Sequence, residues 1–373
     1  MNFEPLKAYL DRLVGLGIPG CHLTVWQHHQ EIFRHLSGES APGIPMDGTE
    51  NYWFYSATKV FTMTAAMQLI ERGKMDLDDP VYLYLPAFKN MTVRDGDSVR
   101  PARTVMTIRH LMAMQGGFNY NMNVPSIKDC IQKYGRKATT RQIIDALANE
   151  PLDFDPGTHF QYSLCHDVMA AVIESVSGKL FSEYLKENIF NPLGIQTLTL
   201  HPTEEQIQHL AARYCWDGAE KPIIQDNRLN EFGESDAYES GGAGLCGNVD
   251  GYILLSDALA NGGIGKSGNQ ILKPESINQL RTNQQFNAAR YDFDQLYRVG
   301  YGYALGVRTM VDNRYSKGPI GEFGWDGAAG AYTLIDPERG LSAFFGAHVL
   351  GMGRAYTDFH PTIRDLIYTG LRD

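Results

Sequence analysis

Apolar residues recur with two different periods along the chain. Residues 3–14 carry apolar side chains at helical spacing, and this pattern ends before Gly15. The period then changes, because 21–27 and 31–36 alternate like the paired strands of a hairpin. Three strand-like runs and a closing helical pattern lie near the C-terminus: 302–310, 331–335, 341–348 and 360–371. Both ends of the chain are therefore expected to supply strands.

The middle of the chain is dominated by helical patterns and loops. The helical patterns are 107–114, 140–148, 167–176, 181–189, 249–260 and 274–282. Strands at both ends predict a mixed α/β fold, in which one sheet built from both termini is flanked by helices. We expect 1–84 and 287–373 to form this α/β part and 85–286 a mainly helical part, with the active site in a cleft between them.

Composition and charge exclude several classes of partner. The chain has 373 residues, of which 43% are hydrophobic, and its formal net charge is -10 with lysine and arginine spread thinly. Neither nucleic acid nor a membrane surface is therefore an expected partner. Five scattered cysteines without a C-x-x-C pair favour reduced thiols. No leader pattern opens the chain and no apolar run approaches about 18 residues, which predicts a cytoplasmic protein. The oligomeric state stays open.

Glycine-rich matches to nucleotide-binding motifs fail on their context. Gly-x-Gly-x-x-Gly begins at Gly15, Gly242 and Gly263, but none of the three follows a strand pattern and opens a helix. The segment 260–267 resembles a phosphate-binding loop, yet it follows a helical pattern and does not lead into another helix. Neither a Gly-x-Ser-x-Gly elbow nor a His-Glu-x-x-His zinc motif is present. No cofactor or metal is expected.

The most informative motif is Ser56-Ala57-Thr58-Lys59, which stands where a long, largely apolar helical pattern begins. Residues three apart on a helix lie on one face with Cβ atoms about 5–6 Å apart, so the Ser56 hydroxyl can meet the Lys59 amine. A neighbouring base turns serine into a nucleophile, and a helix N-terminus favours developing negative charge. Taken alone, such a motif is more often a helix cap followed by a solvated lysine.

Two further segments can supply the partners that this motif needs. Tyr162 stands where a turn and a short extended piece lead into a helical pattern, and its phenol could exchange a proton with Lys59 during acid–base catalysis. Alone, Tyr162 would more often be a core residue. The segment 321–330 is rich in glycine and precedes a strand pattern, so its backbone can approach a substrate closely and donate N–H groups to an oxyanion.

These three segments, in this order, resemble the serine β-lactamase and penicillin-binding-protein superfamily. The likeness is greatest to its class C-like branch, and within it to the family VIII carboxylesterases. It extends from about residue 15 to about residue 350 and includes three more segments: Pro192-Leu193-Gly194, Gly242-Ala243-Gly244-Leu245 and Leu272-Lys273-Pro274-Glu275-Ser276. The resemblance implies a β-lactamase-like fold with an antiparallel sheet and an inserted helical region.

The resemblance also implies roles for individual residues. Ser56 would be the nucleophile, and Lys59 and Tyr162 would transfer protons. The backbone N–H groups of Ser56 and Ala328 would form the oxyanion hole.

Two departures from the β-lactamases point away from penicillins. Tyr-x-Asn is replaced here by Tyr162-Ser163-Leu164, and Lys-Thr-Gly by Trp325-Asp326-Gly327. Both changes remove polar recognition of a β-lactam carboxylate; Trp325 offers an apolar wall and Asp326, if it faces the cleft, an opposing charge. Little β-lactamase activity is therefore expected. The residues expected to contact the substrate are Tyr55, Leu164, Trp325, Asp326 and Gly327.

The resulting prediction is a serine hydrolase that forms an acyl-enzyme on Ser56 and cleaves small-molecule carboxylic esters. Whether Lys59 or Tyr162 is the base stays open, because a coupled pair titrates as one system. An amidase or D-amino peptidase, a β-lactamase and an acyltransferase would use the same chemistry on another bond or acceptor. A ligand-binding relative without catalysis belongs to a different class.

Overall fold

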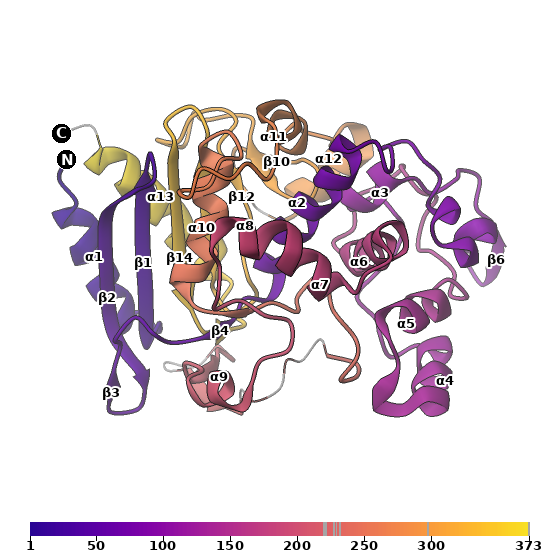
Figure 1. The fold of residues 1–373 in the computed structure, drawn as a ribbon, viewed down its shortest axis with the longest axis horizontal. Coiled ribbons are helices and arrows are strands. Elements are labelled where there is room, and N and C mark those ends of the chain that lie inside the picture. Colours follow the sequence, from indigo (N-terminus) through magenta and orange to yellow (C-terminus); the bar gives the residue numbers. More distant parts are fainter. Residues whose placement is uncertain (219–221, 227, 229, 231–232, 297, 372–373) are drawn as a thin grey trace.

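An eight-stranded sheet forms one side of the computed structural model, which describes residues 1–218, 222–226, 228, 230, 233–296 and 298–371 (Figure 1). Every neighbouring pair in the sheet is antiparallel. In spatial order the strands are β10 (Tyr301–Tyr303), β11 (Arg308–Met310), β12 (Phe323–Gly324), β13 (Tyr332–Asp336), β14 (Leu341–Ala347), β1 (Gly20–Gln27), β2 (Gln30–Ala41) and β3 (Ile44–Pro45). The sheet thus joins the two ends of the chain, as the sequence predicts.

The seam between the two ends is the pairing of β14 with β1, which runs from Cys21 opposite Ala347 to Gln27 opposite Leu341. Successive side chains of a strand point to opposite faces. Phe344 accordingly packs in the core beneath the central helices, whereas Phe345 packs in a second core on the other face. Burial on both faces explains why β14 is apolar at all positions but Ser342.

Helices cover both faces of this sheet. The second core joins one face to α1 (Glu4–Gly15) and α13 (His360–Gly370), which also pack against each other. The opposite face is covered by α10 (Val249–Ala260), whose Tyr252 ring stacks on Phe344 with centroids 3.8 Å apart. Beyond this layer, α2 (Thr58–Glu71) packs against α6 (Cys165–Ser177). α2 therefore connects the sheet side of the molecule to its helical side.

The remaining elements form the helical side and its connections. The helices are α3 (Ile108–Met112), α4 (Pro125–Tyr134), α5 (Thr140–Leu147), α6 (Cys165–Ser177), α7 (Phe181–Leu185), α8 (Asn191–Leu193), α9 (Glu204–Gln208), α11 (Pro274–Leu280) and α12 (Asn287–Asp294). Single turns occur at η1 (Tyr55–Ala57), η2 (Val81–Leu83), η3 (Pro86–Asn90), η4 (Gly135–Lys137), η5 (Lys186–Phe190) and η6 (Ala355–Phe359). In a small three-stranded sheet, β7 (Arg213–Cys215) lies between β15 (Val349–Leu350) and β8 (Ile223–Gln225). Two further pairs are β4 (Tyr52–Trp53) with β9 (Cys246–Gly247) and β5 (Thr92–Asp95) with β6 (Ser98–Pro101).

Some elements differ from the sequence prediction. The run 302–310 forms two short strands, because the chain turns at Gly306, whose φ of +89° suits glycine. The helices α4 and α12 were not predicted. α10 has the predicted bounds but packs on the sheet, although it lies in the range assigned to the helical part. The division at residues 84 and 286 stays a prediction.

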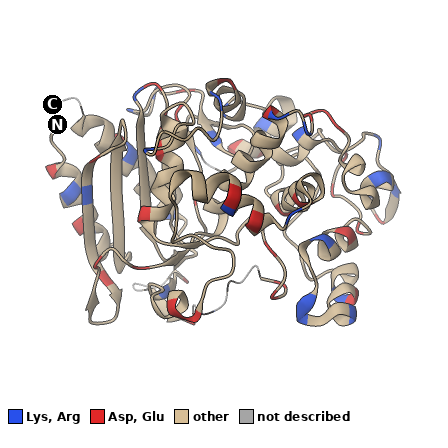
Figure 2. Cartoon of the chain, viewed as in Figure 1, with Lys and Arg blue, Asp and Glu red and all other residues tan. Residues whose placement is uncertain are grey.

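Charge and cysteine placement agree with the composition. Figure 2 shows basic and acidic residues scattered over both sides of the molecule. All five cysteines are free thiols. Within the described ranges, no helix is both long and apolar enough to span a membrane.

Candidate active site

Ser56 lies in the turn η1, immediately before α2 begins. Lys59, on the first turn of that helix, donates a hydrogen bond from Nζ to Ser56 Oγ over 3.1 Å. The lysine side chain is fully buried, while Ser56 is partly exposed. No side chain caps either η1 or α2. A capping serine followed by a solvated lysine therefore does not describe this motif.

The residue before Ser56 has an unusual backbone conformation. Tyr55 has φ = +46°, a left-handed conformation that costs energy in a residue other than glycine. Its ring is fully buried, and Arg213 Nη1 donates to its hydroxyl over 2.9 Å. These contacts hold the sharp turn that presents Ser56. Tyr55 was expected to contact substrate, but its full burial gives it a supporting position.

Lys59 also donates to two groups besides Ser56. Its Nζ lies 2.9 Å from the hydroxyl of Tyr120 and 2.7 Å from the carbonyl oxygen of Gly242. An ammonium has three donors, so these neutral oxygens match all of them. No carboxylate of the described residues forms an ion pair with Lys59. The amine is thus held in one position by neutral groups.

Tyr162 lies beside this cluster, and its hydroxyl is held from another direction. Lys59 Nζ is 4.8 Å from the centroid of the Tyr162 ring, and Trp325 Nε1 donates to the Tyr162 hydroxyl over 2.8 Å. The ring of Tyr120 is 5.5 Å from that of Tyr162. The structure therefore brings Ser56, Lys59 and Tyr162 together, but the phenol bonded to Lys59 is that of Tyr120.

Tyr120 was missed in the sequence. Burial, together with the neighbouring Tyr162 and Asp167, raises the pKa of Tyr120 well above that of a free tyrosine. The phenol therefore keeps its proton and can donate it in a hydrogen bond. The available signal was weak: Tyr120 stands between two asparagines in a loop after a glycine pair, where no periodicity marks it.

A buried carboxylate holds the segment whose carbonyl oxygen, that of Gly242, accepts a hydrogen bond from Lys59. Asp167, on α6, accepts hydrogen bonds from Tyr238 Oη at 2.9 Å and from Ser240 Oγ at 2.5 Å. It also accepts from the backbone N–H of Gly242 at 3.4 Å. A Cβ at Gly242 would lie 2.5 Å from Asp167 Oδ2, so only glycine fits there. Asp167 thereby fixes the turn at Gly242 whose carbonyl oxygen accepts from Lys59, a role the sequence did not reveal.

The glycine-rich segment approaches Ser56 from the sheet side. A Cβ at Gly327 would lie 2.4 Å from the carbonyl oxygen of Phe54, which explains the glycine. Tyr356 donates to the carbonyl oxygens of Gly327 and Ala328 over 3.0 and 3.1 Å. In the part of the chain that the structure describes, the backbone N–H groups of Ser56 and Ala328 have no hydrogen-bond partner. Both groups are available to an oxyanion.

Two of the expected substrate contacts lie elsewhere. The Asp326 carboxylate lies 2.9 Å from Arg298 Nη2 and 3.2 Å from Arg308 Nη1. Trp325 and Asp326 are consecutive in extended chain, so their side chains point to opposite faces, and the face with Tyr162 takes Trp325. Asp326 therefore does not present its charge to the cleft. Leu164 and Trp325 are each 3% exposed and pack in the main core.

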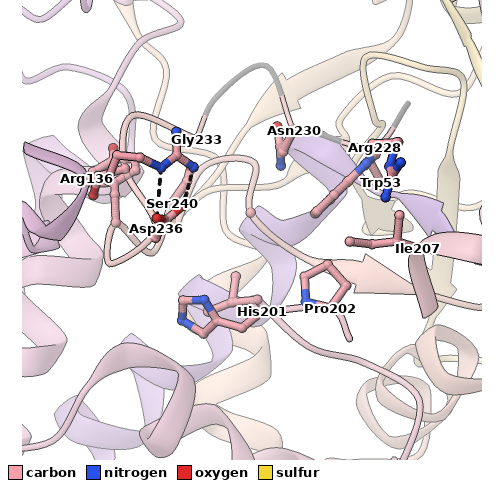
Figure 3. A pocket seen from close by; sticks show the side chains of 14 residues that line it. Trp53, Arg136, His201, Pro202, Ile207, Arg228, Asn230, Gly233, Asp236 and Ser240 are labelled. Carbon is pink, nitrogen blue, oxygen red and sulfur yellow. Dashed lines mark hydrogen bonds and ion pairs between the residues drawn. The ribbon is translucent and has the colours of Figure 1, made fainter. Parts of the chain in front are cut away.

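Two hollows adjoin these residues. A groove of about 620 Å³ is lined by Tyr120 and by the apolar side chains of Met122, Ile127 and Ile131. A pocket of about 340 Å³ lies beside the Ser240–Gly244 segment; its wall includes His201, Pro202 and Ile207, and Arg136 is bonded to Asp236 at its rim (Figure 3). The groove is the hollow that includes a residue bonded to Lys59. Across the described ranges, no group of three His, Cys, Asp or Glu could hold a metal ion.

The fold and this cluster define a β-lactamase-like serine hydrolase. The Beta-lactamase family model matches residues 6–357, and the chain belongs to this family. Esterases, peptidases and acyltransferases occur in its superfamily. The large antiparallel sheet with its helices agrees with this fold.

Individual relatives are distant but cover most of the chain. Protein Rv1367c of Mycobacterium tuberculosis is 25% identical over 91% of this chain and 88% of its own length. Esterase EstB of Burkholderia gladioli is 26% identical over 87% of this chain and 84% of its own. Among solved structures, EstCE1, a hydrolase with promiscuous acyltransferase activity, superimposes with a TM-score of 0.79 and 26% identity, covering 98% of both chains.

Proposed function

We propose that this protein is a carboxylesterase that forms an acyl-enzyme on Ser56. The observation that carries the proposal is the 3.1 Å hydrogen bond between Lys59 Nζ and Ser56 Oγ, made by a buried amine whose other donors are fixed by neutral oxygens. A nucleophilic serine needs a base within hydrogen-bond reach, and that base must be held in a fixed orientation toward the serine hydroxyl. Ser56 has both.

The reaction proceeds in two halves. Ser56 Oγ loses its proton to the Lys59 and tyrosine cluster and attacks the ester carbonyl carbon. The carbonyl oxygen becomes an oxyanion held by the N–H groups of Ser56 and Ala328. The bond to the alcohol then breaks, and the alcohol oxygen takes the proton. Water attacks the acyl-enzyme by the same route, which releases the carboxylic acid and restores Ser56.

The tyrosines give the proton a path. The Trp325 indole can only donate, so it occupies a lone pair of the Tyr162 oxygen, and the Tyr162 O–H can be donated toward the leaving group. Tyr120 accepts from Lys59, and its own O–H can donate in turn. We propose that Tyr162 delivers the proton to the alcohol and that Tyr120 holds Lys59 in place. This assigns Tyr162 to catalysis and Tyr120 to positioning.

The cleft favours esters over β-lactams. Trp325 occupies the place of a lysine that would hold a β-lactam carboxylate, as in the family VIII carboxylesterases, and the Asp326 charge is directed away. The apolar lining of the groove at Met122, Ile127 and Ile131 suits an acyl or alcohol chain with apolar surface. The names of EstB and EstCE1 support ester hydrolysis.

A second function is acyl transfer, in which an alcohol replaces water. The acyltransferase activity named for EstCE1 favours it. Adding an alcohol such as butanol to p-nitrophenyl butyrate separates the two reactions. A hydrolase gives mainly butyrate, and a transferase gives mainly butyl butyrate.

The proposal is tested by turnover of p-nitrophenyl acetate, p-nitrophenyl butyrate and a chromogenic cephalosporin. We expect the esters to be hydrolysed and the cephalosporin to turn over at least about tenfold more slowly. Ser56→Ala should lower ester turnover by about 10³-fold or more, whereas the exposed Ser98→Ala should not change it. Ester turnover that survives Ser56→Ala would refute the mechanism. Fast cephalosporin turnover would refute the preference for esters.

A further inference from the structure

A third hollow lies away from the proposed reaction centre. It has a volume of about 200 Å³ and is bounded by sheet residues such as Tyr301 and Tyr332 and by His360 and Arg364 of α13. Ser56, Lys59 and Tyr162 do not line it. The carboxylate of Asp326 does, so the pocket lies behind the strand segment whose Trp325 contacts Tyr162.

The pocket wall is rich in guanidinium groups. Arg298, Arg308 and Arg364 all line it, and Asp326 is the one carboxylate among the described lining residues. Arg364 is engaged by Asp365 at 2.9 Å, outside the lining. Glu322, also outside it, accepts from Tyr301 Oη at 2.6 Å and lies 3.8 Å from Arg308 Nη2. Arginine keeps its charge in such surroundings, so the lining itself carries three cations and one carboxylate.

Arg298 has donors that the protein does not use. Its Nη2 pairs with Asp326, but its Nε and Nη1 are covered from solvent and have no hydrogen-bond partner among the described residues. The side chain is 12% exposed, and its guanidinium lies 4.4 Å from the centroid of the Tyr356 ring. A buried donor without a partner is costly, and a planar guanidinium held on an aromatic ring is positioned to donate to an oxyanion.

We propose that this pocket binds a small organic anion through one carboxylate or phosphate group. Arg298 and Arg364 bind the anionic group, while the tyrosine rings and Val299 contact the rest of the ligand. The volume is below the range of about 300–1,000 Å³ that is usual for drug-sized ligands, so the ligand is a few carbon atoms beyond its anionic group. The proposal does not depend on the function of Ser56.

The site also touches the backbone near the reaction centre. Arg298 stacks on Tyr356, and Tyr356 donates to the carbonyl oxygens of Gly327 and Ala328. Arg298 is bonded to Asp326, which directly precedes this pair in the chain. An anion that engages Arg298 therefore binds next to the residues that hold the Ala328 segment.

The test is isothermal titration calorimetry at constant ionic strength with phosphate, benzoate and the neutral benzamide. We expect saturable binding of one anion per chain and no binding of benzamide. Comparison of phosphate with benzoate identifies which anionic group the pocket prefers. Arg298→Gln and Arg364→Gln should each weaken binding at least tenfold. Arg354→Gln, which removes an exposed arginine outside the pocket, should change it less than twofold. Circular dichroism checks that each variant is folded, and Arg298→Lys keeps the charge if Arg298→Gln does not fold.

Three results would overturn the proposal. One is the absence of saturable binding for both anions. Another is binding that is unchanged by substitution of Arg298 and of Arg364. A third is loss of binding in Lys59→Met, which would place the anion beside the other buried cation, in the cleft. Unchanged binding in Lys59→Met, together with an anion-dependent rise in melting temperature of the wild type, supports the pocket.

Discussion

Two buried cationic centres lie next to consecutive residues of one strand segment, and their surroundings differ. Trp325 contacts the tyrosine beside Lys59, whereas Asp326 pairs with Arg308. Lys59 is held by a hydroxyl, a phenol and a carbonyl, all neutral. Arg308 is held by a carboxylate. Lysine can give up its proton in a buried site and arginine cannot, so the first centre suits proton transfer and the second suits fixed charge.

The difference shows how one segment can serve both purposes. The alternation of side chains along extended backbone directs Trp325 toward Tyr162 and Asp326 toward the arginines. The cleft keeps an amine without a competing carboxylate, and the arginine centre keeps its counter-charge. Each of the following changes tests one side of this contrast.

The largest effect is expected for replacement of Lys59. Lys59→Met removes the amine, and Lys59→Arg keeps the charge but not the ability to give up a proton. Both should lower kcat/KM for p-nitrophenyl butyrate by about 10³-fold or more. Near-normal activity in Lys59→Arg would mean that charge alone matters, and the contrast with the arginine centre would fail.

The two tyrosines should differ in size of effect. Tyr162→Phe removes the proposed proton donor to the alcohol and should lower kcat by about 10²–10³-fold. Tyr120→Phe leaves one donor of Lys59 without its partner and should cost about tenfold to 10²-fold. Esters with more acidic alcohols need less help from an acid, so they should rescue Tyr162→Phe but not Tyr120→Phe. The same rescue in both variants would contradict the division of roles.

Asp326→Asn tests the arginine centre through stability. It leaves Arg298 without its carboxylate and Arg308 with Glu322 alone, 3.8 Å away, and we expect the free energy of unfolding to fall by about 3–5 kcal/mol at pH 7 in urea titrations. Activity per folded molecule should fall less than tenfold, because Asp326 does not face the cleft. A large loss of activity in a stable variant would place this carboxylate in the reaction.

The same variant predicts a pH dependence. Burial alone would raise the pKa of Asp326, but Arg298 and Arg308 outweigh it and hold that pKa well below its usual range. The contribution of the ionised carboxylate is therefore present above the unfolded-state pKa of about 3.9 and is lost as the pH falls through the folded-state pKa. The stability difference between wild type and Asp326→Asn should be constant from pH 5 to 7 and shrink below about pH 4. A difference that grows on acidification would contradict the ion pair.

The smallest effect concerns the groove. Ile131→Trp places a larger side chain in the groove and should fill space beside its apolar wall. The substitution should lower kcat/KM for p-nitrophenyl butyrate about fivefold to tenfold more than kcat/KM for p-nitrophenyl acetate. The neighbouring Gln132→Ala, which removes a polar lining residue, should leave the ratio within twofold. Equal losses for both esters after Ile131→Trp would show that the chain does not bind in this groove.

Local patterns predicted much of the fold. The strand at 21–27 and the bounds of α10 could be predicted, because short-range periodicity indicates local secondary structure. The sequence did not predict which element α10 packs against. A helix that is apolar on most sides has no single apolar stripe, so its pattern does not indicate which face contacts a neighbour. Its packing on the sheet follows only from the assembled fold.

The site was partly predictable for the same reason. Ser56 and Lys59 lie within one helical turn, so their spacing alone brings them together. Tyr120 is 61 residues from Lys59 and lies in a loop, where no period marks its contact. The direction of Asp326 could have been inferred, because it cannot share a face with Trp325 in extended backbone.

The most direct test of the account is intact-mass measurement after treatment with a fluorophosphonate. Wild-type protein should gain the mass of one phosphonyl group, peptide mapping should place it on Ser56, and Ser56→Ala should gain none. Ser98→Ala should be labelled as the wild type is. Labelling of Ser56→Ala to the same extent, or a label on another residue, would contradict Ser56 as the nucleophile.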